Sequence, residues 1–172
     1  MDPAKVEVDD GDSVVIHWTP SDHEIVRILA RADDGASFAE YDLAPDETPP
    51  RAVPVADRPY GGNRSAVVFG IISTPTEKVP EGMRRVLILS DPTRGMGALA
   101  APECDRVLAA IDLAEKHGLP VEWAPISAGA RIAMDSGTEN LDATARVARR
   151  IVTFTQGGGV IHVVEHERRR LI

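Results

Sequence analysis

Between residues 65 and 164, apolar runs of strand length alternate with longer segments whose apolar residues have helical spacing. Nearly continuous apolar runs at 65–72 and 85–90 predict two strands in a sheet that is covered on both faces. Further strands are predicted at 121–126 and 160–164. Strands that alternate with helices favour an α/β layered fold with parallel pairing.

Two helices are predicted between these strands. The first runs from Pro102 to His117 after a glycine-rich loop, and Gly118 follows at the usual stop position. We expect its core face to consist of Cys104, Val107, Leu108, Ile111 and Ala114. Cys104 is therefore expected to pack in the core, since nothing beside it in sequence would activate a thiol.

The second helix is predicted from about Thr138 to Gln156, where three consecutive glycines end it. Several of its apolar or small residues recur at helical spacing, and we expect them to form the face that packs on the core. These residues are Leu141, Ala145, Ala148, Ile151, Val152 and Thr155.

The first 60 residues differ from the rest because they are rich in proline and acidic residues. We expect a short strand at 13–18, a short helix at 23–31 and irregular extended backbone at 42–59. The sequence thus divides into an N-terminal arm, residues 1–60, and a folded domain, residues 61–172.

Charge and cysteine content exclude several function classes. The net charge is −8, which argues against broad nucleic-acid binding and against binding to an anionic membrane surface. A single cysteine excludes an internal disulfide framework and a cysteine-rich zinc site, and it suits a cytoplasmic protein. No run approaches the roughly 18 apolar residues of a membrane-spanning helix.

The segment from Ser127 to Ile132 follows a predicted strand and consists largely of small residues. A glycine and two alanines let the backbone approach a ligand closely. Free N–H groups at such a turn can hold a carbonyl oxygen that is gaining negative charge. The segment is therefore a candidate oxyanion-binding turn.

Several motifs in fixed order resemble one known family from about Tyr41 onward, most strongly from Arg84 to Val164. The chain resembles the carboxyltransferase component of biotin-dependent acyl-CoA carboxylases, in part of its N-terminal half. The motifs are Asp91–Gly97, Pro102–Asp105, Gly118–Val121, Ser127–Ile132, Met134–Asp142 and Phe154–Gly159.

The resemblance implies a truncated crotonase-type fold, built from strand–strand–helix units, that binds an acyl-CoA or another acyl thioester. The family transfers a carboxyl group from carboxybiotin to the α-carbon of the acyl group. The carboxybiotin here would be carried by a partner, with no cofactor bound covalently. The resemblance makes Gly129 and Ala130 catalytic, as the source of one oxyanion N–H. It makes five residues substrate-binding, namely Arg94, Gly95, Ser127, Ala128 and Arg131.

Family members continue into a second glycine-rich turn that supplies another oxyanion donor, and the resemblance places this turn beyond Ile172. Three hypotheses follow. The chain stabilises an enolate together with a partner or as an oligomer. Alternatively, it is a non-catalytic remnant that acts by association. It could also be a segment of a longer carboxylase.

Two other motifs allow alternative interpretations. The string His162 to His166 matches the H-x-x-E-H pattern of a zinc-peptidase class, which requires a helix. Its β-branched residues instead predict a strand, so we expect no metal site. The loop 91–97 is either a plain strand-to-helix connection or a contact for CoA phosphates through Arg94, although it lacks the Lys-Ser/Thr ending of a P-loop.

Overall fold

The computed structural model describes residues 7–8, 14–15, 35–45, 47–56, 58, 62–91, 94–127, 129–131 and 138–164. Six of the described strands form one sheet in the order β4-β3-β5-β6-β7-β8. The strands of this sheet are β3 (Ser37–Leu43), β4 (Ala52–Pro54), β5 (Val67–Thr74), β6 (Met83–Ser90), β7 (Val121–Ala124) and β8 (Ile161–Val163). A separate antiparallel pair consists of β1 (Glu7–Val8) and β2 (Val14–Val15).

The sheet is mixed. The three strands β6, β7 and β8 are parallel, which confirms the predicted parallel pairing for this part of the chain. The pairs β3–β4, β3–β5 and β5–β6 are antiparallel. A short loop joins β5 to β6, and such a connection permits only an antiparallel neighbour.

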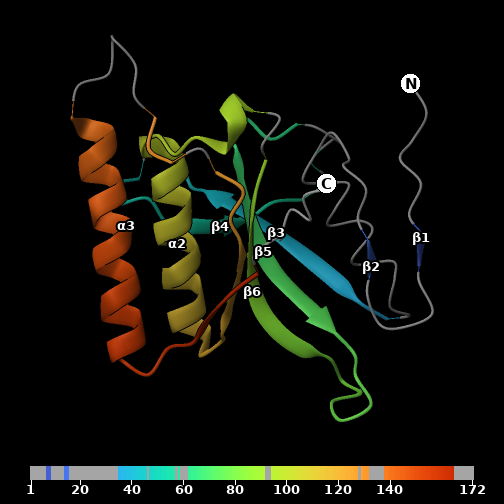
Figure 1. The fold of residues 1–172 in the computed structure, drawn as a ribbon. Coiled ribbons are helices and arrows are strands. Elements are labelled where there is room, and N and C mark those ends of the chain that lie inside the picture. Colours follow the sequence, from blue (N-terminus) through green and yellow to red (C-terminus); the bar gives the residue numbers. More distant parts are fainter. Residues whose placement is uncertain are drawn as a thin grey trace, which may run out of the picture.

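Two helices, α2 (Ala101–His117) and α3 (Glu139–Gln156), connect the parallel strands, and a short 3-10 helix, η1 (Gly95–Gly97), precedes α2. Both helices begin within a residue of their predicted starts. Gly118 ends α2 in the left-handed conformation with a φ of 62°, as its position predicts. Figure 1 shows that α2 lies between the sheet and α3.

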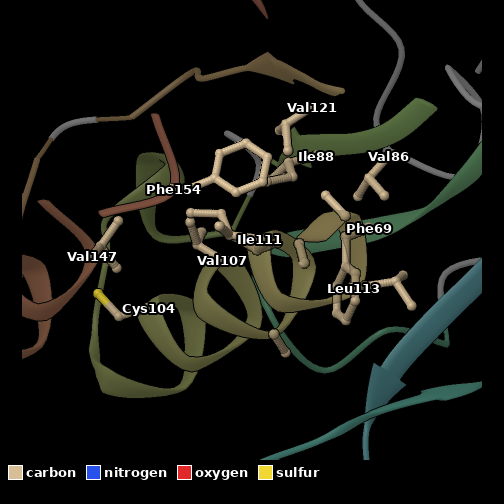
Figure 2. Packing of buried hydrophobic residues seen from close by; sticks show 14 of the residues in the cluster. Phe69, Val86, Ile88, Cys104, Val107, Ile111, Leu113, Val121, Val147 and Phe154 are labelled. Atoms are coloured by element: carbon tan, nitrogen blue, oxygen red, sulfur yellow. The ribbon is translucent and has the colours of Figure 1, made fainter. Parts of the chain in front are cut away.

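The main core lies between α2 and the sheet. Figure 2 shows Phe69, Ile88 and Val121 of the strands facing the apolar residues of α2, with the Phe154 ring reaching in from α3. Alternate residues of the same strands, such as Leu87, are equally buried on the opposite face. The prediction that these strands are buried on both faces is therefore confirmed.

Cys104 lies in this core, as predicted. Its side chain is 0% exposed, so burial raises the pKa of the thiol from its ordinary value of 9.0 to about 11, helped by the neighbouring Asp105 and Glu103 carboxylates. A thiol with such a pKa is almost entirely protonated at neutral pH and is a poor nucleophile. Cys104 is a packing residue.

The expectation of irregular backbone over 42–59 is wrong in two places. Residues 42–43 belong to β3, and Ala52–Pro54 form β4, so the sheet begins within the first 60 residues. Five residue pairs join β3 to β5, and Arg58 forms ion pairs with Glu40 at 2.7 Å and Asp42 at 2.5 Å. These long-range contacts outweigh a local composition that disfavours strands.

The predicted core face of α3 is also wrong. Leu141 and Val152 are 53% and 51% exposed, and Ala145, Ala148 and Thr155 are exposed as well, while Ile151 is half-buried. The buried residues are instead Asn140, Ala143, Val147 and Phe154. At about 100° per residue, the centre of this buried stripe lies about 130° around the helix from the exposed residues of the predicted stripe, so the two stripes face different directions.

The reason for this orientation is the contact between α3 and α2. Ala143 and Val147 are small enough to let the two helices pack closely. Arg150 then bridges to α2, with ion pairs to Asp112 at 2.7 Å and Glu115 at 2.8 Å. Helical periodicity led us to the stripe that includes Leu141 and Val152, but it carries no information on which side of α3 meets α2.

The remaining expectations for the N-terminal region lie mostly outside the described residues. The predicted strand at 13–18 overlaps β2, and the predicted helix at 23–31 is not among the described residues. Within the described part of the chain, no helix is both long enough and apolar enough to cross a membrane.

Matched substitutions on α3 test the direction in which this helix faces. Val147→Ala should lower the free energy of unfolding by about 2 kcal/mol, because Val147 is 4% exposed and its methyl groups fill the core. Val152→Ala, the same change on the exposed side, should alter it by less than about 0.5 kcal/mol. Urea denaturation measures both values, and equal losses would contradict the observed orientation.

Candidate functional site

Two loops meet beyond the carboxyl ends of the parallel strands β6 and β7. Leu99, in the loop after β6, forms an isolated parallel bridge with Ala130, in the loop after β7. The Leu99 N–H donates to the Gly129 carbonyl at 2.8 Å, and the Arg131 N–H donates to the Leu99 carbonyl at 2.8 Å. In open α/β sheets, ligands bind outside the carboxyl ends of the strands, where these loops meet.

This bridge determines which peptide groups remain available. In a parallel ladder, alternate residues point their N–H and C=O groups to opposite sides. Gly129 and Arg131 bond to Leu99, so the N–H of Ala130 between them points away from it. No described residue accepts a hydrogen bond from the Ala130 N–H.

The neighbouring N–H of Gly129 is already used. It donates to Ser127 Oγ at 3.0 Å, and that hydroxyl in turn donates to the Gly97 carbonyl at 2.6 Å. Ser127 therefore joins the two loops a second time. Of the two residues expected to be catalytic, only Ala130 has a backbone N–H that is not held by a described residue.

Gly97 permits the close approach of the two loops. It has a φ of 67°, and a Cβ atom at this position would lie 2.0 Å from the carbonyl oxygen of Ile126. By contrast, a Cβ atom added at Gly95, which has a φ of 57°, would meet no other atom within 4 Å. Only glycine fits at 97, for reasons of both conformation and space.

A pocket of about 520 Å³ opens beside this junction. Ala130 lines it, together with Gly95 and three arginines from three separate segments. The arginines are Arg64, Arg94 and Arg131. The guanidinium of Arg94 is held by the buried Asp91 carboxylate at 3.5 Å. The pocket therefore combines a backbone N–H with concentrated positive charge.

The structure brings most of the predicted site residues together. Arg94, Gly95, Ala130 and Arg131 line the pocket, while Ser127 and Gly129 lie beside it as internal hydrogen-bonding partners. The exposed Arg131 side chain is free to turn toward a ligand. The remaining predicted residue, Ala128, is outside the described residues.

Two polar residues that support the site were not predicted from the sequence. Asn140 is buried; its Oδ1 accepts from the Ala101 N–H at 3.1 Å, and its Nδ2 donates to the Arg131 carbonyl at 3.0 Å. It thereby connects the first residue of α2 to the turn. Asn140 belongs to the Met134–Asp142 motif of the family resemblance, and this was the only signal for its role. A polar residue near the start of a helix is otherwise expected to face solvent.

Glu103 secures the opposite side of the pocket. Its carboxylate accepts hydrogen bonds from Ser65 Oγ at 2.9 Å, the Ala66 N–H at 3.3 Å and the Ala100 N–H at 3.2 Å. These bonds hold the start of α2 against the chain that enters β5. A glutamate in the first turn of a helix is a recognisable signal for capping but not for this long-range contact.

The zinc interpretation of the His162 motif is not supported. His162 lies on the strand β8, as predicted, rather than on a helix. No group of three or more potential metal-ligating His, Cys, Asp or Glu residues occurs among those whose positions are described.

Comparison with known proteins finds similarity to solved structures but not to known sequences. No family model and no curated protein sequence matches the chain. Among solved structures, the beta subunit of geranyl-CoA carboxylase from P. aeruginosa is similar, with a TM-score of 0.52 and 20% identity. The match covers 77% of this chain and 21% of that subunit.

The chain shares its fold with part of that subunit. The likeness supports the α/β fold class that the resemblance to carboxyltransferases implied, and the six-stranded sheet with helices α2 and α3 is consistent with it. At 20% identity it concerns the fold alone, and this chain spans 21% of the subunit's length.

Two glycine substitutions test how tightly the loops are joined. Gly95→Ala should lower the free energy of unfolding by about 1 kcal/mol, the usual cost of a left-handed alanine. Gly97→Ala should cost about 2 kcal/mol more, because its Cβ also collides with the Ile126 carbonyl. Thermal or urea unfolding gives both values, and similar losses would show that the loops do not approach this closely.

Proposed function

We propose that this chain binds an acyl thioester, of the acyl-CoA class, in the pocket beside Ala130 and stabilises its enolate. The supporting observation is the Ala130 N–H, which points away from Leu99 at a pocket lined by three arginines. Gly129, the other expected donor, is engaged by Ser127. Ala130 is therefore the oxyanion donor in this proposal.

The chemistry follows from where negative charge develops. When the α-carbon of a thioester loses a proton, the electron pair of the C–H bond forms a C=C bond and the π pair of the carbonyl moves onto its oxygen. A fixed N–H aimed at that oxygen binds the enolate more strongly than the neutral thioester, and this difference lowers the barrier. The bridge to Leu99 holds the donor in place before the reaction begins.

Carboxyl transfer is the reaction of the resembling family, and we propose it for this chain. Carboxybiotin carried by a partner would supply the carboxyl group through cleavage of its N–CO₂ bond, and the freed biotin nitrogen would take the α-proton. The enolate carbon held at Ala130 would then form the new C–C bond to the carboxyl group. The second oxyanion donor of such a site would come from another chain or a further segment. We assign no described residue to biotin.

Removal of one N–H tests the proposal. Ala130→Pro deletes the donor without breaking the bridge, because the Ala130 N–H does not bond to Leu99. Enolate formation, measured as exchange of α-hydrogen from acetyl-CoA or propionyl-CoA in D₂O, should slow by about 10²–10³-fold. The control Ala130→Ser keeps the N–H and should stay within about threefold of the parent rate.

Two results would reject the proposed function. One is an unchanged exchange rate in the Ala130→Pro variant. The other is an unmodified chain that neither binds acyl-CoA at millimolar concentration nor catalyses exchange.

A second candidate function is self-association without catalysis. The exposed apolar side of α3, which includes Leu141 and Val152, is flanked by the exposed basic residue Arg149. A chain with a net charge of −8 offers acidic surface to such a basic flank, so a second copy is the occupant we infer.

Light scattering tests this association. The unmodified chain should form a dimer, and Leu141→Glu combined with Val152→Glu should convert it to a monomer, because charge replaces the apolar contact. Val163→Glu, at a residue equally exposed on β8, is the control and should remain dimeric. A monomeric parent chain would contradict the second function and leave the first unaffected.

A further inference from the structure

We propose that the three pocket arginines recognise a carboxylate on the acyl group itself, so that the preferred substrate is the thioester of a dicarboxylic acid. This inference rests on the proposed function, since it takes the thioester carbonyl to lie at the Ala130 N–H. It adds the chemical class of the acyl chain, which the oxyanion donor alone does not specify.

The charge around the pocket is unbalanced. The described residues that line it include three arginines, Arg64, Arg94 and Arg131, and one acidic residue, Glu103, while the Asp91 carboxylate pairs with Arg94 at 3.5 Å. The Glu103 carboxylate already accepts three hydrogen bonds, from Ser65, Ala66 and Ala100. Among the described residues, neither Arg64 nor Arg131 has a carboxylate within ion-pairing distance. Although the whole chain has a net charge of −8, the pocket is therefore locally positive and suited to binding an anion.

The size of the pocket indicates which anion it is. The sulfur of an extended CoA thioester lies roughly 15 Å from the nearest phosphate, because about thirteen bonds separate them. A compact pocket of about 520 Å³ is only roughly 10 Å across. Arginines that line the same pocket as Ala130 are therefore near the acyl group rather than near the CoA phosphates.

Guanidinium groups suit a carboxylate at this position. Each presents a planar set of N–H donors that matches the two carboxylate oxygens. Arg94 is oriented by Asp91, whereas the exposed side chains of Arg64 and Arg131 can close on a ligand from two sides. A neutral acyl chain would offer no carboxylate to Arg64 and Arg131, so the pocket should discriminate against it.

Pantetheine thioesters test the inference, because they carry the thioester but no phosphate. Calorimetry should show glutaryl-pantetheine binding about 10–100-fold more tightly than the neutral hexanoyl-pantetheine, the range expected for hydrogen bonds to a charged group. Arg64→Gln with Arg131→Gln should remove this preference, so that the two thioesters bind with similar affinity. Arg84→Gln, at an exposed arginine of β6 outside the pocket, is the control and should retain it.

The outcomes separate this inference from the proposed function. Equal binding of the acidic and neutral thioesters would overturn the inference and leave the proposed function standing. Tight binding of CoA thioesters alone, lost in the Arg64→Gln and Arg131→Gln variant, would assign the arginines to phosphate and also overturn it. Binding of no thioester at millimolar concentration would reject both.

Discussion

The backbone bridge between Leu99 and Ala130 is the interaction on which the candidate site depends. Two hydrogen bonds of 2.8 Å join loops that are separated in the sequence by the whole of α2 and β7. They fix the direction of three successive peptide groups and turn the N–H of Ala130, a residue that lines the pocket, away from Leu99. Ser127 and Asn140 reinforce the same junction from opposite ends of the turn.

The bridge requires a rigid support, and the core provides it. The parallel strands β6 and β7 place the two loops side by side, while α2 covers the strands with an apolar face that is almost wholly buried. Asn140 and Glu103 then connect the start of α2 to each side of the pocket. A substitution that shifts α2 on the sheet should therefore also displace the turn at Gly129–Arg131.

Local sequence patterns predicted those parts of the fold that local physics determines. Apolar runs gave β5 and β6, and helical spacing with a terminal glycine gave α2. The face of α3 was predicted wrongly because two apolar stripes exist, and only contact with α2 selects between them. The strands β3 and β4 escaped prediction because pairing with β5 and the ion pairs of Arg58 stabilise them from a distance.

The candidate site, like the fold, was predictable from the sequence only where local patterns determine it. Small residues after a strand indicated the turn, but the sequence could not separate Gly129 from Ala130, since the choice depends on partners in another loop. Arg64 joins the pocket from a third segment, which no local motif could show. Contacts between distant segments thus single out one peptide group of the candidate oxyanion-binding turn, the Ala130 N–H, and bring three arginines to the pocket beside it.

The most direct measurement is the backbone amide NMR spectrum during titration with a stable enolate-mimicking thioester analogue. The account predicts a large downfield shift of the Ala130 amide proton as it bonds to the analogue's oxygen. The Gly129 amide should move little, because Ser127 already holds it. A shift at Gly129 with none at Ala130, or a saturable titration that moves neither, would contradict the assignment of Ala130 as the oxyanion donor.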